Sequence, residues 1–126
     1  MKFLLDTHLL LWWLSGSRSL SKTGRRLIAN PDHAIFVSAV TLWEIRLKES
    51  LGKLDLPVDF EERLNGEAFE PLPLTAAHVH NIAGLPWHHR DPFDRMLVAQ
   101  ARAERMRLLT ADEQLAAYGD AVMVAK

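Results

Sequence analysis

The sequence KFLLDT, at residues 2–7, decides the class of fold that we predict for this chain. A short apolar run that stops at an aspartate and a threonine is typical of a buried strand followed by a turn. Residues 9–14 then form a second apolar segment before the break SGS at residues 15–17. We therefore expect a strand at residues 2–5, a tight turn and a short helix.

The same alternation of strand and helix continues to the end of the chain. Further strands are expected at residues 34–37, 69–74, 107–110 and 121–125, and further helices at residues 20–30, 38–52, 57–66, 75–84, 92–105 and 112–118. Pro71 and Pro73 make the strand at 69–74 irregular, because proline donates no backbone hydrogen bond. Such alternation indicates an α/β fold with a mainly parallel sheet of four or five strands, flanked by helices and joined by right-handed crossovers.

Length and composition describe one compact domain that spans residues 1–126. Of the 126 residues, 48% are hydrophobic and 25% are charged, which provides enough apolar side chain for a core and excludes general disorder. There is no cysteine, so disulfides are excluded and a reducing cytoplasm, where we expect the protein, is compatible. We expect no membrane span and no signal peptide, because the apolar runs are short and interrupted.

The charges nearly balance, with 15 lysines and arginines against 16 aspartates and glutamates, for a formal net charge of −1. Proteins that hold nucleic acid by bulk attraction need a basic surface. That mode of binding is therefore excluded, and any contact with nucleic acid must come from local charge.

Acidic residues gather at the edge of the predicted sheet where the strands end. Asp6 follows the first strand, Glu44 lies in the helix after the second, Asp91 and Asp94 open a later helix, and Asp112 follows the strand at 107–110. Ligands of parallel sheets bind at this edge. Packed carboxylates repel one another unless a cation lies among them, and hard cations such as Mg²⁺ or Mn²⁺ prefer oxygen ligands. We therefore expect a metal site formed by these five acids.

Helix capping is the alternative explanation for each acid taken singly. Aspartate is a favoured N-cap, and Glu44 could complete a capping box with Thr41. The sequence leaves two roles for Asp91: an N-cap paired with Asp94, or a ligand of the metal. Capping would be served equally by serine, threonine or asparagine, so the repeated choice of an acid favours a metal site.

The charges outside the acid cluster favour a phosphodiester substrate. Without the five acids, 15 basic residues face 11 acidic ones, a net of +4. A metal-filled acidic pocket in a basic surround suits phosphodiester hydrolysis, because cations polarise the phosphate and activate a water while basic side chains hold flanking phosphates. The candidates for such contacts are Arg46, Lys48, Lys53, Arg90 and Arg95, although for each one taken singly a solvated surface charge is the favoured interpretation.

Four spaced motifs then resemble a known family. They are LLDTH at residues 4–8, SAVTLWEI at 38–45, HRDPFDR at 89–95 and LTAD at 109–112. Together with LVAQA at residues 97–101, they resemble PIN-domain ribonucleases, and more narrowly VapC-type toxins of bacterial type II toxin–antitoxin pairs. The matching segments run from residue 3 to about residue 119, in the order that the family has.

The resemblance implies a three-layer PIN-like fold and a Mg²⁺- or Mn²⁺-dependent endoribonuclease that cuts cellular RNA and stops translation. Asp6, Glu44 and Asp94 correspond to the three central acids, Asp112 to a more variable fourth, and Asp91 to an extra acid of one subgroup. The partners it implies are a small antitoxin protein and a second copy of the chain, with DNA contacted only through the antitoxin. The side chains beside the acids that could support them are Thr7, Ser38 and Thr110.

The aromatic and histidine residues have separate interpretations. We expect core packing for Trp12, Trp13 and Trp43 because they lie in apolar helical stretches. Trp87 lies in a polar loop and could stack on an unpaired base or on a partner's side chain. We interpret the adjacent pair at residues 88–89 as polar loop histidines that could touch RNA.

Two other classes of function remain as alternatives. A non-catalytic PIN-like module would bind RNA or protein and use its acids only as caps. A Mg²⁺-dependent phosphoryl-transfer protein would use Asp6 as its nucleophile, but it would also require a late catalytic lysine, and no lysine lies between residues 54 and 125.

Overall fold

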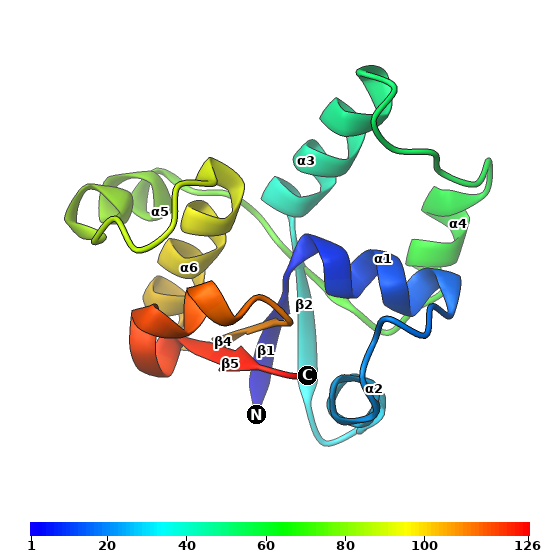
Figure 1. Cartoon of the computed structure of the whole chain (residues 1–126), viewed down its shortest axis with the longest axis horizontal. Coiled ribbons are helices and arrows are strands. Elements are labelled where there is room, and N and C mark those ends of the chain that lie inside the picture. Colours follow the sequence, from blue (N-terminus) through cyan, green and yellow to red (C-terminus); the bar gives the residue numbers. More distant parts are fainter.

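A parallel sheet of five strands forms the centre of the computed structural model, which describes all residues 1–126 (Figure 1). The strands lie in the order β3-β2-β1-β4-β5 and every neighbouring pair is parallel. Their bounds are β1 Lys2–Leu5, β2 Ala34–Ser38, β3 Glu70–Leu72, β4 Arg107–Thr110 and β5 Val122–Val124. The expectation of a mainly parallel sheet with up to five strands is confirmed.

Helices cover both faces of this sheet, which makes three layers. The α-helices are α1 Thr7–Ser15, α2 Lys22–Ala29, α3 Ala39–Ser50, α4 Phe60–Asn65, α5 Ala76–Asn81 and α6 Pro92–Glu104, and the 3₁₀-helices are η1 Ile82–Gly84 and η2 Glu113–Ala121. None of the helices has the length and apolar character needed to cross a bilayer.

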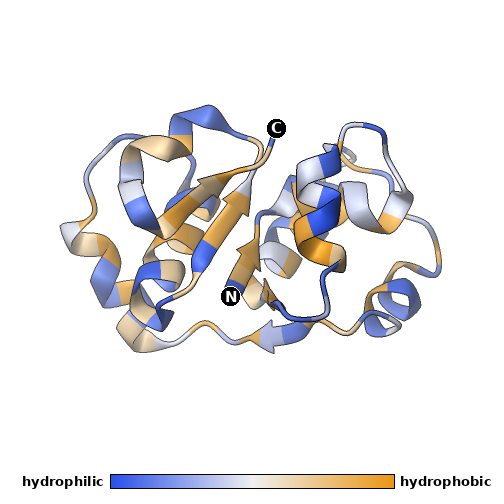
Figure 2. Cartoon of the chain, turned by 90° about the horizontal axis from the view of Figure 1, so that it is seen from below, coloured by the Kyte–Doolittle hydropathy of each residue, from blue (hydrophilic) through white to orange (hydrophobic).

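The central strand β1 is buried on both faces, as its uninterrupted apolar sequence predicts. Phe3 and Leu5 pack into a core shared with α1 and α2, whereas Leu4 packs into a second core with α6 and η2. All three side chains are fully buried. Figure 2 shows the resulting concentration of hydrophobic residues along the strands.

Several elements are shorter or less regular than the sequence predicts. The strand expected at 69–74 is reduced to β3, as its prolines favour, and the helix expected from residue 57 begins only at Phe60 because residues 57–60 form a turn closed by the Phe60 N–H and the Pro57 carbonyl (3.0 Å). The helix expected at 112–118 is a 3₁₀-helix that continues to Ala121. It is kinked at Gly119, whose φ of +77° favours glycine.

Candidate active site

The five predicted site acids lie at one edge of the sheet, where β1, β2 and β4 end and α1, α3 and α6 begin (Figure 1). Because the strands are parallel, segments that are up to 106 positions apart in the chain meet at this edge. A cavity of about 290 Å³ opens there, and its walls include the side chains of Asp6, Asp94 and Asp112.

Asp6 is almost fully buried and held by two hydrogen bonds. One carboxylate oxygen accepts the backbone N–H of Leu9 (2.8 Å) and so caps α1, and the other accepts the hydroxyl of Thr110. Burial raises the pKa of Asp6 although both hydrogen bonds favour the carboxylate. Asp6 is therefore both a cap and a wall of the acidic cavity.

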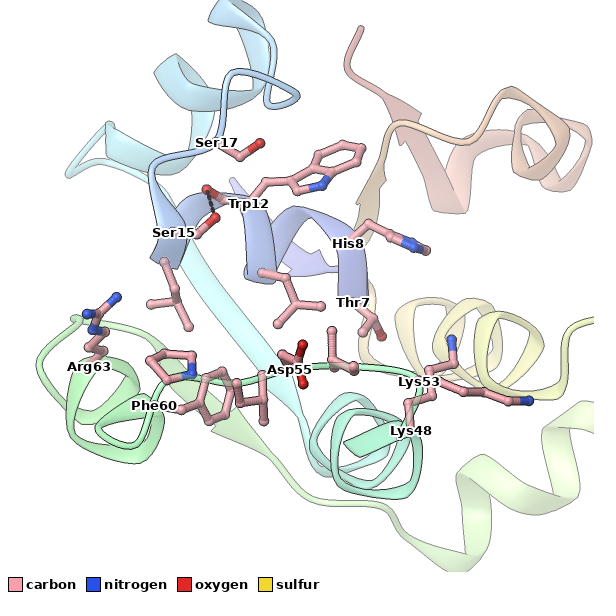
Figure 3. A pocket seen from close by; sticks show the side chains of 15 residues that line it. Thr7, His8, Trp12, Ser15, Ser17, Lys48, Lys53, Asp55, Phe60 and Arg63 are labelled. Atoms are coloured by element: carbon pink, nitrogen blue, oxygen red, sulfur yellow. Dashed lines mark hydrogen bonds between the residues drawn. The ribbon is translucent and has the colours of Figure 1, made fainter. Parts of the chain in front are cut away.

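Glu44 is also buried, and its carboxylate joins two helices. It accepts the Thr7 hydroxyl at 2.6 Å and is paired with Lys48, one turn further along α3 (Figure 3 shows both partners). The Glu44 carboxylate raises the pKa of Lys48. The alternative in which Glu44 completes a capping box with Thr41 is wrong, because Ser38 caps α3 and places Glu44 in the second turn.

Asp91 and Asp94 open α6 in different roles. A side-chain oxygen of Asp91 accepts the backbone N–H groups of Phe93 (2.8 Å) and Asp94 (3.1 Å), so Asp91 is the N-cap. Asp94 does not close a capping box, since the N–H of Asp91 is bound by His89 instead. Burial, followed by the charges of Asp91, Asp6 and Glu44, raises the pKa of Asp94 to about 7.

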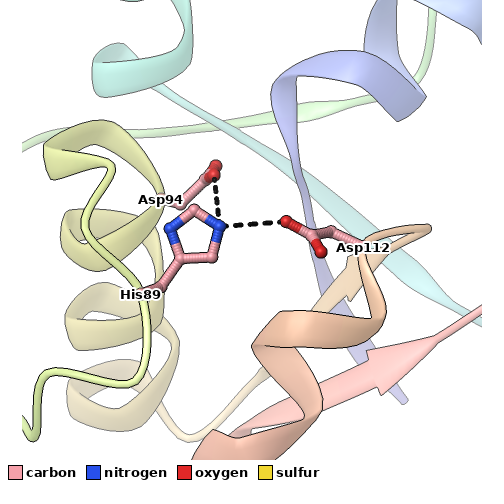
Figure 4. A group of neighbouring side chains, drawn as sticks. All are labelled: His89, Asp94 and Asp112. Carbon is pink, nitrogen blue, oxygen red and sulfur yellow. Dashed lines mark hydrogen bonds and ion pairs between the residues drawn. The ribbon is translucent and has the colours of Figure 1, made fainter.

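His89 belongs to this site, which corrects its interpretation as a polar loop residue. Its Nδ1 accepts the N–H of Asp91 at 3.1 Å, so in the neutral ring the proton is on Nε2. That Nε2 lies 3.0 Å from a carboxylate oxygen of Asp112 and 3.7 Å from Asp94 (Figure 4). The only sequence signal was its place just before the acid pair that opens α6.

The donor set fits a hard divalent cation. Carboxylate oxygens of Asp94 and Asp112 lie within 4.8 Å of each other and of a ring nitrogen of His89. Because His89 Nε2 donates its hydrogen to Asp112, the carboxylates are the candidate ligands. Asp6 and Glu44 contribute further negative charge, and their charges are among the causes that raise the pKa of Asp94. The site therefore carries more negative charge than Lys48 compensates, and a cation such as Mg²⁺ or Mn²⁺ would relieve it.

The residues expected to support the acids are partly confirmed. Thr7 and Thr110 bind Glu44 and Asp6, as described above. Ser38 contacts no acid: its hydroxyl donates to Gln100 (2.5 Å) and accepts the N–H that begins α3.

The candidate phosphate contacts separate into three groups. The prediction that Arg95 contacts a phosphate is wrong, because this side chain is buried and donates to the carbonyl oxygens of Pro86 (2.9 Å) and Leu85 (3.3 Å). Arg46 pairs with Glu49 on the surface, and Lys48 is bound to the site acid Glu44. Lys53 and Arg90 are exposed and form no ion pair, so they remain candidates.

The prediction of core packing holds for two of the three tryptophans to which it applied. Trp12 and Trp13 are partly buried against the core, as expected. Trp43 is 60% exposed, with its ring against Phe93 at 4.9 Å between centroids, so the expectation that it packs in the core is wrong. Its place in an apolar helix misled the prediction because the exposed face of α3 carries apolar residues too.

A larger groove of about 550 Å³ adjoins the acidic cavity. It lies between α1, the end of α3, and α4, and shares His8 and Trp12 with the cavity (Figure 3). Apolar residues and the carboxylate of Asp55 line its middle, whereas Lys48 and Lys53 lie at the end near Thr7 and Arg63 lies at the other end. The groove therefore has basic side chains at both ends, with apolar residues and one carboxylate between them.

This fold and acid arrangement define a class of α/β proteins with a candidate metal centre at the edge of a parallel sheet. The chain belongs to the PIN domain family, whose pattern matches residues 3–121, and the resemblance in the sequence is confirmed. It is 25% identical over 118 residues to ribonuclease VapC22 of Mycobacterium tuberculosis, a match that covers 91% of this chain and 90% of that protein.

Solved structures share the fold. One is VapBC2 from Rickettsia felis bound to a DNA fragment from its promoter, with a TM-score of 0.73, 15% identity and all of both chains covered. Another is VapBC-5 from Mycobacterium tuberculosis, a toxin–antitoxin system, with a TM-score of 0.62, 22% identity and coverage of 99% of this chain and 98% of that one.

Proposed function

We propose that this chain is a metal-dependent endoribonuclease toxin that cleaves cellular RNA in the cytoplasm, inhibits translation and is neutralised by an antitoxin. The observation that carries the proposal is the cavity walled by Asp6, Asp94 and Asp112, where burial and then neighbouring negative charge raise the pKa of Asp94 to about 7. The membership of the PIN family and the likeness to ribonuclease VapC22 support it.

The cation, Mg²⁺ or Mn²⁺, would be held by carboxylates of Asp6, Asp94 and Asp112, with Glu44 and Asp91 adding charge around it. When bound, it would supply Lewis-acid activation of water and charge neutralisation of the scissile phosphate.

The chain's own residues preorganise this centre. Thr110 and the start of α1 fix the orientation of Asp6, and Thr7 fixes that of Glu44. His89 donates its Nε2 hydrogen to Asp112. This bond orients a carboxylate whose side chain is 42% exposed. Carboxylates held in this way lose little conformational entropy when they bind a cation or face a substrate.

Asp6 does not suit the phosphoryl-transfer alternative. A nucleophilic aspartate of that class acts together with a late lysine, and no lysine lies between residues 54 and 125.

Purified wild-type protein and the variant Asp94→Asn, incubated with total bacterial RNA in Mg²⁺, in Mn²⁺ and in EDTA, test the proposal. We expect discrete cuts with the wild type in metal only, and a loss of at least about a hundredfold in rate for Asp94→Asn, because the carboxylate both adds charge and faces the cavity. Asp32→Asn, an exposed acid at the opposite edge of the sheet, is the matched control and should cut normally.

Absence of cutting by folded wild-type protein in either metal would contradict the nuclease proposal. RNA or protein binding without cleavage would then favour the non-catalytic module. Cuts that persist in EDTA would contradict the metal dependence but leave the nuclease intact.

We assign the antitoxin to the groove that adjoins the acidic cavity. Its apolar middle suits the apolar face of a bound segment, and an acidic segment end would meet Lys48 and Lys53. The complexes named above, in which related folds are solved as VapBC assemblies, support this choice of partner. Contact with promoter DNA would belong to the antitoxin.

We assign a second copy of the chain to the exposed face of α3. Trp43 and Leu47 lie on that face and Leu51 is the C-cap residue that follows it; the three recur every four residues and are 60%, 38% and 59% exposed. Apolar side chains aligned in this way are typical of a surface that another protein covers.

A further inference from the structure

The loop between η1 and α6 presents a tryptophan to solvent in a fixed orientation. Trp87 is 75% exposed, yet the guanidinium of Arg95 lies over its ring, 3.6 Å from the ring centroid. Arg95 is itself buried and anchored by the carbonyl oxygens of Leu85 and Pro86. A fixed cation therefore supports one face of the indole, and the exposed part of the ring can stack on a ligand.

This loop is connected directly to the acid cluster. His89, two residues after Trp87, reaches Asp112 at 3.0 Å and Asp94 at 3.7 Å. Two residues span at most about 7 Å of backbone. Trp87 is therefore within reach of a strand whose phosphate lies at the acids.

The surroundings of Trp87 are basic. Trp87, Arg90, Pro92 and Arg95 line one hollow of about 320 Å³. Arg90 is exposed and has no hydrogen bond or ion pair, so its charge is available to a ligand. An aromatic ring for a base beside an arginine for a phosphate is how proteins hold unpaired nucleotides.

We propose that Trp87 and Arg90 form a subsite for one unpaired nucleotide of the RNA that flanks the cleaved phosphate. The base stacks on the exposed part of the Trp87 ring, and Arg90 contacts the adjoining phosphate. This inference rests on the proposed nuclease function and names the form of RNA that the site takes. No acidic side chain lines the hollow, and the free charge of Arg90 suits a phosphate, so an unpaired nucleotide is the occupant that we argue for.

Binding of a fluorescein-labelled single-stranded RNA of twelve nucleotides, followed by anisotropy in EDTA to prevent cleavage, tests the subsite. Trp87→Ala should weaken binding about tenfold or more, because stacking on one aromatic ring contributes that much per base. Trp87→Phe should remain within about threefold of the wild type, since it keeps a ring.

Arg90→Gln separates the phosphate contact from the stacking. It should weaken binding and reduce the slope of log affinity against log salt by about 0.7, as the loss of one single-strand phosphate contact does. Trp87→Ala should leave that slope unchanged. Arg102→Gln, at the far end of α6, is the matched control and should change neither quantity.

RNA with one abasic site at each position in turn identifies the stacked base. One abasic position should weaken binding to the wild type but not to Trp87→Ala. Equal affinities of the wild type and Trp87→Ala for intact RNA would overturn the subsite, as would a Trp87→Ala variant that loses only self-association or protein binding.

The two proposals fail separately. A wild type that cuts RNA, with Trp87→Ala equal to it in affinity and in cut positions, overturns the subsite alone. A wild type that binds unpaired RNA through Trp87 but never cuts it overturns the nuclease and leaves Trp87 and Arg90 as a nucleotide-binding site without a cleaved phosphate.

Discussion

Asp94 is the residue whose environment says most about the site. Its side chain is 22% exposed, and burial together with three neighbouring carboxylates raises its pKa from the ordinary 3.8 to about 7. Only His89 acts in the opposite direction. Such a carboxylate resists ionisation in the absence of a cation, which has a measurable consequence for stability.

Between about pH 4 and pH 7 the unfolded chain ionises Asp94 while the folded protein keeps it protonated. The stability contributed by the protonated form is therefore complete below about pH 4 and lost as the pH rises through 7. We expect metal-free Asp94→Asn to be more stable than the wild type at pH 8, by on the order of 4 kcal/mol, with little difference at pH 4. Thermal or urea unfolding in chelator at several pH values measures this.

Added cation provides the complementary test of Asp94. Mn²⁺ or Mg²⁺ at pH 8 should raise the melting temperature of the wild type more than that of Asp94→Asn, since only the former has the full set of carboxylates. Asp32→Asn should behave as the wild type does. A wild type whose stability relative to Asp94→Asn does not change from pH 4 to pH 8 would contradict this account of the charge.

The start of α6 shows how an element places a residue. Proline at the first helical position and the Asp91 cap begin the helix, and this in turn sets Asp94 one turn along, facing the cavity. The cap and any metal contact of Asp91 can be separated, because serine caps as well as aspartate but carries no charge.

Asp91→Ala should lower the free energy of unfolding by about 1 kcal/mol, whereas Asp91→Ser should stay within a few tenths of the wild type. If the charge of Asp91 also supports cation binding, as we propose, both variants will need more Mg²⁺ for half-maximal RNA cleavage. Urea unfolding and a metal titration of cleavage measure the two effects. A serine variant with the wild-type metal requirement would leave Asp91 as a cap only.

Most elements were predictable because their signals are local. Thr75, the first residue of the helix expected at 75–84, caps α5. Gly52, the last residue of the helix expected at 38–52, has a φ of +72° two residues beyond the end of α3. The errors occurred where local signals compete: Pro57 favours a helix start, but residues 57–60 form a turn, and the helix expected to reach residue 84 becomes 3₁₀ at Ile82. Propensity does not decide between such closely related conformations.

At the scale of the whole molecule, the exposed face of α3 predicts self-association. We expect the wild type to be a dimer at micromolar concentration and Leu47→Glu to raise the dissociation constant more than about tenfold, because a charge replaces an apolar contact. Light scattering after size exclusion, or sedimentation, measures the mass. Val58→Glu, fully exposed and outside α3, is the control. A wild type that stays monomeric at high concentration would contradict the dimer.

The sequence by itself determined the α/β class, the parallel sheet and the edge at which the acids lie. These three features follow from the alternation of short strands with helices along the chain, and from the rule that the carboxyl ends of parallel strands lie at the same edge of a sheet. It also identified Asp6, Asp94 and Asp112, which the structure brings to one cavity.

Only the tertiary structure decided which neighbour each of these groups meets. His89 binds Asp112 across 23 positions of chain, Thr110 binds Asp6 across 104, and Arg95 is used to anchor a loop instead of a phosphate. The physical reason is that hydrogen bonding and burial depend on packing between distant segments, whereas periodicity and capping depend on residues a few positions apart.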